Sequence, residues 1–370
     1  MKVIEEVNND LLKKHSFEPV LKRNYGIDLL KIVAMINIIN LHINRDSLLS
    51  LNPTHPKYKQ VYRLQTFSFW PVDVFGIISG LVNYKKYKFS NLIYIWLEYV
   101  YYSFILSLYL YYKSLLNLRE LFLSFFPIAK KRFWYANAYF FLYLFLPFLN
   151  NSINVIDKSK FIKLIGLYFF VYSFYHTLIE YNIGQTNFDF TNDGYSSLWL
   201  ILLYIVGGYL GRFYINKPLL SKLSLFFLYL FSSFFSSEYI FYSFKKYKLA
   251  STILMRYNSP TIIIQSLSLI FLFYNIKINN KYFQKVILFF NPLNFNVALI
   301  HLRVFLFKTP TISRFFKFIR TLTQKNLFFK IYGISTIIYF ICAFFDYFRF
   351  ILFKLLKIKN FCNYIEKTLF

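Results

Sequence analysis

Hydrophobic residues occur in long blocks, separated by short polar stretches, from residue 26 to residue 354. A helix needs about 20 mainly apolar residues, within a range of roughly 17–25, to cross the hydrocarbon core of a bilayer. The block lengths predict an all-α fold, a polytopic transmembrane helix bundle with about ten spans. The predicted spans are residues 26–44, 67–84, 92–112, 133–150, 161–180, 195–211, 219–238, 259–276, 286–307 and 330–354.

One domain is expected to occupy nearly the whole chain, because no Pro-rich linker or extra polar domain separates the blocks. We expect a cytoplasmic N-terminal segment at 1–24, an integral-membrane domain at 25–355 and a basic C-terminal tail at 356–370. The N-terminal segment is polar and mixed in charge, unlike a cleavable signal peptide, so the first span should be retained. The stretch 114–132 is apolar enough to lie in the membrane interface and is not counted as a span.

Composition agrees with a membrane protein. Hydrophobic residues make up 57% of the chain and charged residues only 16%, whereas soluble domains carry about 25% charged residues. The net charge of +27 comes from short basic clusters between apolar blocks, which are suited to anionic lipid head groups rather than to nucleic acid. Two isolated cysteines, Cys342 and Cys362, predict neither a metal site nor a disulfide framework.

The distribution of basic residues gives little information on which side of the membrane the termini lie. An even number of spans places both termini on one side of the membrane, and Lys and Arg are divided almost evenly between the two sides. The positive-inside rule therefore does not decide the orientation on the total count. The short basic stretches at 21–24 and 85–88 favour a cytoplasmic N-terminus.

The first span contains the clearest candidate chemistry: Asp28, Lys31 and His42 lie within one apolar block. Lys31 and His42 are eleven positions apart, which places them roughly 20° apart around a helix and about 16 Å apart along it. Asp28 lies close to the same face, where it can pair with the ammonium. Ionisable side chains inside spans usually line a cavity or a pathway. The alternative is that Lys31 extends its charge to the interface and His42 only caps the span.

A polar path of this length would suit a coenzyme A thioester. Such a donor could keep its phosphates near cytoplasmic cations while its long arm carries the acyl group into the bilayer. A histidine there could take the proton from an attacking hydroxyl, because its pKa is ordinarily near neutrality.

The second span offers Ser79 and Gly80, which permit close helix approach and provide a hydroxyl that could donate a hydrogen bond. Asp73 lies near the outer end of this span. The alternative interpretation is a small-residue packing notch with an aspartate at head-group level.

Later spans carry His301 and Arg303, of which the arginine is suited to binding phosphate or carboxylate with two hydrogen bonds. The remaining charged or titratable candidates have no obvious partner in the sequence and are interpreted as span-end or interhelical contacts. They are Glu98, His176, Glu238 and Asp346.

The first span resembles that of the acyltransferase 3 family of integral-membrane acyltransferases. That family shows a basic residue, ten intervening residues and a histidine, commonly preceded by isoleucine and aspartate. The matching positions here are Ile27, Asp28, Lys31 and His42.

Further segments resemble the same family in order. VDVFGIISG is similar to the phenylalanine-rich turn that ends in Ser-Gly, and FWYANAYFFLYLFLPFLN to a Trp-aromatic segment that closes on a proline. ALIHL is similar to a late span that ends in a histidine. The matching positions are Phe75, Ser79 and Gly80, then Trp134, Tyr143 and Pro147, and finally His301.

The resemblance implies an O-acetyltransferase of the bacterial cytoplasmic (inner) membrane, multi-pass, with its N-terminus in the cytoplasm. It implies no bound cofactor, acetyl-CoA or another acyl-CoA as donor substrate, and a cell-surface polysaccharide or glycolipid as acceptor. In that scheme His42 is the general base or acyl relay, and Lys31 with Asp28 contacts the donor. The residues expected to contribute to donor or acceptor binding are Phe75, Ser79, Trp134, His301 and Arg303.

A different class remains open on the residues alone. A transporter or flippase for a lipid-linked sugar also combines about ten spans with intramembrane charges. The absence of two-half symmetry and the concentration of polar residues in the first two spans favour the enzyme. A glycan polymerase would be expected to present a large external loop, and the external loops here are short.

Overall fold

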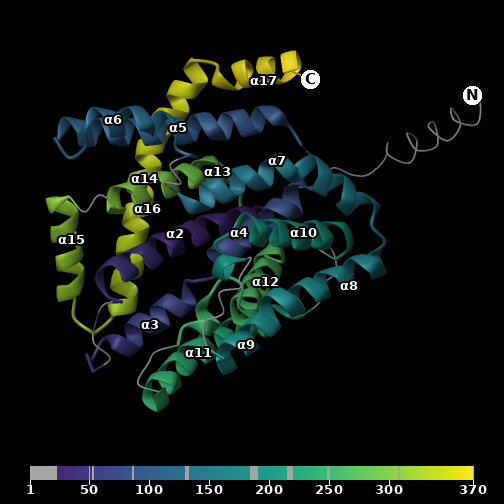
Figure 1. Ribbon diagram of the computed structural model, residues 1–370, viewed down its shortest axis with the longest axis vertical. Coiled ribbons are helices and arrows are strands. Elements are labelled where there is room, and N and C mark those ends of the chain that lie inside the picture. The colour runs from purple at the N-terminus through teal and green to yellow at the C-terminus, as the bar shows by residue number, and fades with distance from the viewer. Residues whose placement is uncertain are drawn as a thin grey trace, which may run out of the picture.

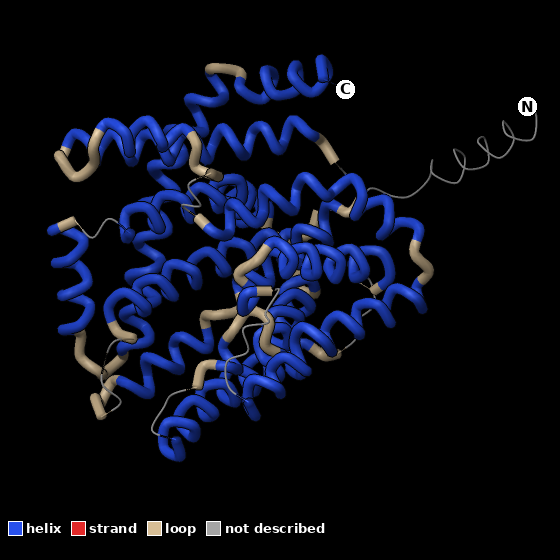
Figure 2. The backbone as a smooth tube through the Cα atoms, in the orientation of Figure 1, coloured by secondary structure: helices blue, strands red, loops and turns tan. Residues whose placement is uncertain are grey.

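The computed structural model describes residues 23–49, 51, 54–85, 87–129, 133–183, 191–214, 220–247, 251–306 and 309–369, apart from the side chains of 180–183, 303 and 306. All regular structure in these ranges is helical, and no strand occurs within them (Figures 1 and 2). The predicted all-α class is confirmed.

The helices follow one another through short connections. Those of 15 residues or more are α2 (Tyr25–Ser47), α5 (Phe89–Tyr112), α7 (Trp134–Val155), α10 (Ser197–Phe213), α11 (Lys222–Tyr247), α12 (Pro260–Tyr274) and α16 (Leu327–Leu355). The shorter ones are α3 (Tyr58–Phe67), α4 (Pro71–Asn83), α6 (Leu118–Phe122), α8 (Lys158–Phe169), α9 (His176–Ile183), α13 (Lys281–Phe290), α14 (Asn294–Leu306), α15 (Pro310–Thr321) and α17 (Ile358–Leu369). A π-helical turn, Phe170–Tyr175, joins α8 to α9, and a 3-10 turn, Asn291–Leu293, joins α13 to α14. Every segment predicted as a span coincides with a helix or a joined pair of helices.

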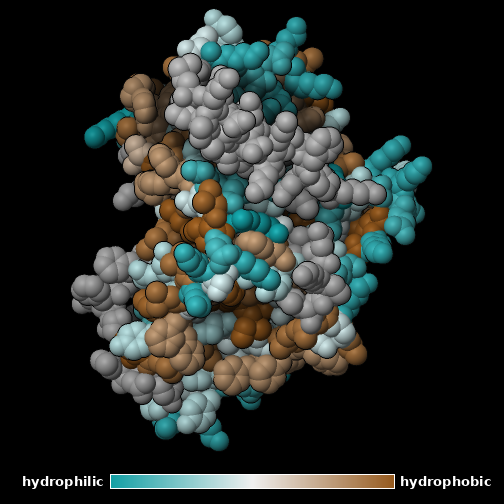
Figure 3. All heavy atoms as spheres, turned by 90° about the vertical axis from the view of Figure 1, so that its right-hand side faces the viewer, coloured by the Kyte–Doolittle hydropathy of each residue, from teal (hydrophilic) through white to brown (hydrophobic). Residues whose placement is uncertain are grey.

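Within the described residues, six helical segments are long and apolar enough to cross a membrane. They are Tyr25–Ser47, Phe89–Tyr112, Lys158–Ile179, Lys222–Tyr247, Lys281–Leu302 and Leu327–Leu355. Helix α10 is a shorter apolar helix of the same character. On the face of the molecule that Figure 3 shows, hydrophobic residues form patches on the surface, with hydrophilic residues between them. These features define a multi-pass helical membrane protein.

Helix α2 is the central element of the bundle (Figure 1). Within its apolar window 61% of the residues are buried, against 11–44% for the other five candidate spans. Its apolar side chains contribute to two hydrophobic cores. One core is shared with α4, α7, α10 and α12, and the other with α5, α14 and α16.

Three asparagines, Asn37, Asn40 and Asn44, hold α2 against its neighbours. Their spacing of three and four residues places them on one helix face. The hydrogen bonds are Asn40 Nδ2 to Ser68 Oγ (2.6 Å), Asn44 Nδ2 to Gln65 Oε1 (2.8 Å) and Tyr332 Oη to Asn37 Oδ1 (2.6 Å). Interhelical polar contacts of this kind stabilise membrane bundles, because apolar packing gains little over contact with lipid tails.

Both ends of α2 are also fixed by other segments. At its start, the Asn24 side chain caps the helix by accepting from Ile27 N (3.1 Å) and donates to Tyr274 O (3.0 Å). At its end, Arg320 Nε donates to Ser47 O (2.7 Å). The helix therefore has a defined position along its whole length.

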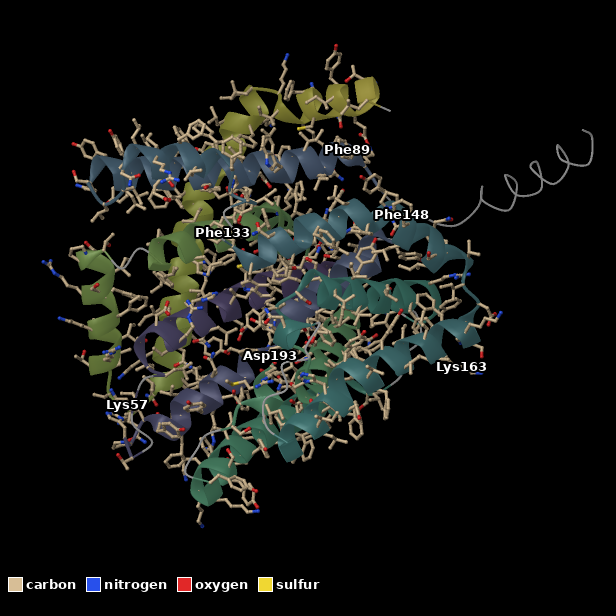
Figure 4. All side chains as sticks on the ribbon, viewed as in Figure 1. Lys57, Phe89, Phe133, Phe148, Lys163 and Asp193 are labelled. Carbon is tan, nitrogen blue, oxygen red and sulfur yellow. The ribbon has the colours of Figure 1, made fainter. Side chains whose placement is uncertain are left out.

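The segment expected to be a basic tail is helical over Ile358–Leu369 and packs against the start of α5. The backbone N–H of Phe89, marked in Figure 4, donates to Glu366 Oε1 at 2.6 Å. The contact satisfies one of the amide groups that every helix N-terminus leaves without an internal partner.

Helices α4 and α10 cross at very short range through glycines. A Cβ added to Gly80 would lie 1.9 Å from Tyr204 O, and one added to Gly207 would lie 1.9 Å from Ile77 O. The predicted close approach at Ser79-Gly80 is confirmed, since only a residue without a side chain fits where two backbones meet this closely.

Replacing Gly80 with alanine should lower the free energy of unfolding by about 1–3 kcal/mol, the usual cost of overpacking. The measurement is the thermal unfolding of purified protein in detergent, followed by far-UV circular dichroism. Gly166→Ala is the matched control, because apart from its chain neighbours and its own helix backbone no described atom lies within 4 Å of the added Cβ there. That control should melt at or slightly above the wild-type temperature, and equal melting of the two variants would refute the tight crossing.

Candidate functional site

A cavity of about 420 Å³ lies within the bundle, bounded by α2, α4, α5, α7, the Asn291–Leu293 turn and α14. Its volume is within the range of roughly 300–1,000 Å³ that is usual for small-molecule sites. Six of the residues singled out from the sequence line it: Lys31, His42, Phe75, Ser79, Glu98 and Trp134. The structure thus brings together side chains from three of the segments that carry the sequence motifs.

Helix α2 contributes one continuous stripe to the cavity wall. The stripe consists of Lys31, Met35, Ile38, His42 and Arg45, which recur at alternate spacings of four and three residues. Such spacing keeps side chains on one face of a helix. Lys31 and His42 therefore face the same cavity, as their separation in the sequence predicts.

Asp28 organises the end of the cavity near Lys31. Its carboxylate accepts from Lys31 Nζ (3.1 Å), Arg23 Nε (2.7 Å) and Asn291 Nδ2 (2.8 Å). The predicted pairing of Asp28 with Lys31 is confirmed. Two cations share one carboxylate here, so this end of the cavity carries excess positive charge.

At the other end, His42 has a second histidine behind it. The ring centroids of His42 and His301 are 5.5 Å apart. The cavity wall near His301 is formed by its helix neighbours Ala298 and Leu302, while His301 itself is 1% exposed. His301 is therefore placed to contact His42 rather than a bound molecule.

Ser79 and Trp134 both lie on the cavity wall, where Ser79 is hydrogen-bonded to its own helix and Trp134 packs against other aromatic rings. The Ser79 hydroxyl donates to Phe75 O at 2.8 Å, so its proton is already engaged by the helix. The Trp134 ring packs against Tyr195 and Tyr257, with centroid distances of 4.7 and 5.8 Å. These three aromatic residues line the cavity together, and Tyr257 also stacks on another lining residue, Phe69, at 4.7 Å.

Two further sequence candidates are Arg303 and Asp73. The Arg303 side chain lies outside the described residues. Asp73, considered as an aspartate at head-group level, is fully buried within the protein and accepts from Trp199 Nε1 at 3.1 Å. It is enclosed because the glycine-mediated crossing brings α10 directly onto α4.

A buried ionic cluster supports the cavity wall from the side of α5. Glu98 lines the cavity and pairs with Arg349 Nη1 at 2.7 Å, while Arg349 Nη2 pairs with Asp346 at 2.8 Å. Asn296 Nδ2 donates to Glu98 (3.0 Å) and Tyr102 Oη to Asp346 (2.7 Å). Glu98 and Asp346 are thus interhelical contacts, as predicted. Glu238 is likewise paired, with Arg63 at 2.7 Å, on the exposed surface.

Sequence reasoning missed several cavity residues. Asn291 and Asn294 lie on the wall, and the break in the apolar pattern at NPLNFN was the available signal for them. Tyr135 and Tyr139 also line it, but aromatic residues are too abundant in this chain, at 24%, to be distinguished by type alone.

A partly polar cavity inside a multi-pass helical bundle defines the class as a membrane protein with a candidate small-molecule site in its helical domain. The sequence model of the acyltransferase 3 family, described as an acyltransferase domain, matches residues 24–345. The chain therefore belongs to this family and is a membrane acyltransferase. No curated protein sequence and no solved structure matches the chain.

The buried cluster predicts a strong dependence of stability on Arg349. Arg349→Met leaves two buried carboxylates without their cation and should lower the free energy of unfolding by about 3–5 kcal/mol. The measurement is the temperature at which detergent-solubilised protein loses its monodisperse peak in size-exclusion chromatography.

Arg63→Met is the matched control, because the Arg63–Glu238 pair is exposed, at 43% and 57%. Exposed pairs contribute about 0–1 kcal/mol, so this variant should retain nearly wild-type stability. Indistinguishable behaviour of the two variants would show that the cluster is not the determinant that its burial suggests.

Proposed function

We propose that this protein transfers an acyl group, acetyl in the first instance, from a cytoplasmic acyl-CoA to a hydroxyl of a cell-surface polysaccharide or glycolipid. The observation that supports this proposal most directly is the stripe on α2, which joins a cationic end at Lys31 to His42 along one cavity. About 16 Å of helix separates the two residues. That distance suits a donor with phosphates at one end and a thioester at the end of a long arm.

The cationic end fits the donor phosphates. Lys31 and Arg23 together carry one more charge than Asp28 neutralises, and a polyanionic group entering there would receive both cations. In this orientation the N-terminal end of α2 faces the cytoplasm of a bacterial cell and the protein resides in the inner membrane.

His42 acts as the general base. Its neutral imidazole takes the proton of the acceptor hydroxyl while the hydroxyl oxygen attacks the thioester carbonyl carbon. The carbon–sulfur bond then breaks, and the departing thiolate receives that proton from His42. The products are the acylated sugar and free coenzyme A, and His42 returns to its starting state.

The acceptor approaches from the opposite end of the cavity. There Trp134, Tyr195 and Tyr257 combine broad apolar faces with polar edges, a combination that suits the carbon–hydrogen face and hydroxyl rim of a sugar ring. Ser79 and Phe75 line the wall between the two ends and shape the space for the acyl arm.

The proposal predicts that His42→Ala lowers acyl transfer by about 10²–10⁴-fold, the usual contribution of a positioned base. Radiolabelled acetyl-CoA is incubated with protein in proteoliposomes that contain membrane glycolipid, and labelled lipid and free coenzyme A are measured. Movement of glycolipid without acyl turnover would instead support a transporter and refute the enzyme.

Charge at position 31 is predicted to act on donor binding. Lys31→Arg should retain activity and Lys31→Ala should raise KM for acetyl-CoA, because only the former keeps a cation at the donor end. Lys163→Ala and His176→Ala, which do not line the cavity, are the matched controls. Full activity of Lys31→Ala at low donor concentration would show that the phosphates bind elsewhere.

A further inference from the structure

Two ring nitrogens behind the cavity wall have no hydrogen-bond partner among the described residues. They are His42 Nδ1 and His301 Nε2, and both are buried. Buried polar atoms of this kind are rare and call for an explanation. The two rings are neighbours, with centroids 5.5 Å apart and planes inclined by 50°.

The separation of the rings allows a direct hydrogen bond between these two atoms after a turn of one ring. As the rings stand, neither nitrogen is hydrogen-bonded to the other. A ring nitrogen lies roughly 1.2 Å from the centre of an imidazole, so with centroids 5.5 Å apart a turn of the His42 ring that aims Nδ1 at His301 Nε2 would bring the two atoms to about 3 Å, a hydrogen-bond distance. His42 lines the cavity and its Nδ1 is enclosed. Nε2 is therefore the ring nitrogen left to face the cavity.

The backbone of α14 determines which nitrogen of His301 carries a proton. His301 Nδ1 lies 2.7 Å from Val297 O, and a carbonyl oxygen can only accept. Nδ1 is consequently the protonated nitrogen, and in a neutral ring Nε2 is left with a lone pair. On its other side the His301 ring meets the edge of Phe305 at 5.8 Å, which limits rotation of the ring.

We infer that His301 is a positioning residue that accepts the Nδ1 proton of His42 in a hydrogen bond and so holds the Nε2 lone pair of His42 toward the cavity. This inference rests on the proposed function, in which that lone pair is the base. The order of bonds is Val297 carbonyl, His301, His42 and then the acceptor hydroxyl.

The arrangement has a consequence for the reaction. When His42 takes the hydroxyl proton on Nε2, the ring becomes an imidazolium and its Nδ1–H bond to His301 becomes charge-assisted and stronger. His301 stabilises the charged intermediate state while its own proton stays on Nδ1. A neutral partner also avoids adding a permanent buried charge beside the base, which would be costly in the bundle interior.

Two substitutions at position 301 separate hydrogen bonding from packing. His301→Phe keeps a ring but removes the acceptor, whereas His301→Gln provides a carbonyl oxygen that can accept. With acetyl-CoA and glycolipid as substrates, His301→Phe should lower kcat about 10–100-fold, the range seen when a partner that orients a functional histidine is lost. KM for the donor should stay unchanged, and His301→Gln should recover part of kcat.

The second readout does not depend on activity. Nitrogen-15 NMR of histidine-labelled protein in detergent distinguishes protonated from unprotonated ring nitrogens, and the His42 signals are assigned by their loss in His42→Ala. In the wild type His42 should carry its proton on Nδ1, and in His301→Phe a substantial fraction should carry it on Nε2. His176→Phe, a histidine outside the cavity wall, should change neither kcat nor the His42 signals.

The outcomes separate the two proposals. Protonation of wild-type His42 on Nε2, or an unchanged kcat in His301→Phe, overturns the positioning role and leaves the acyltransferase proposal intact. Absence of acyl transfer in the wild type refutes the proposed function, and the NMR signals then still decide whether the two histidines are bonded as inferred.

Discussion

Polar side chains on α2 cannot face lipid, and this constraint determines the arrangement of the bundle. A helix that carries Asp28, Lys31, three asparagines and His42 is stable in a membrane only when each polar group has a partner or borders a cavity. On the asparagine face each side chain makes a hydrogen bond to α3, α16 or the segment before α4, although Oδ1 of Asn40 and Oδ1 of Asn44 have no partner among the described residues. Lys31 and His42 lie on another face of α2, and this face borders the cavity. The remaining helices pack around a centre that these two faces define.

The walls of the cavity are held by two different kinds of interaction. On one side the glycines of α4 and α10 allow backbone contact, which fixes the helix that carries Phe75 and Ser79. On the other side the Glu98–Arg349–Asp346 cluster ties α5 to α16. A tight steric contact and a buried ionic cluster both resist displacement, so the cavity is bounded by elements with little freedom to shift.

The part of the site that lies on one helix was predictable from the sequence, because residue spacing alone determines which side chains share a face. Lys31, His42 and the Asp28–Lys31 pair were found in this way. The contacts of Asp28 with Asn291, of His42 with His301 and of Glu98 with Arg349 join residues far apart in the chain. No local pattern encodes those pairings. The enclosure of Asp73 within the protein was not predictable for the same reason, since it depends on how closely α10 approaches.

The apolar helices were predictable because the bilayer imposes a length on apolar segments, and that length is visible in the sequence. Six of the ten predicted spans have the length and hydropathy of a membrane-crossing helix in the described residues, and the segments at 67–84, 133–150, 195–211 and 259–276 do not. Orientation was not, because basic residues occur on both sides of the bundle. The shape of the cavity was also hidden, since it depends on side chains from helices that are distant in sequence and on a 3-10 turn, Asn291–Leu293, that appears in the sequence only as an interrupted apolar block.

Because α2 is anchored at Tyr274 and at Arg320, the spacing between Lys31 and His42 is as invariant as the helix itself. Under the proposed function, the fixed distance between Lys31 and His42 along α2 sets how far the donor extends into the cavity. Phosphates held near Lys31 would bring the thioester to the height of His42, and every additional carbon of a longer acyl chain would have to extend past it. The aromatic wall of Trp134, Tyr195 and Tyr257 would oppose such an extension. The protein would therefore accept donors with short acyl groups in preference to donors with long ones.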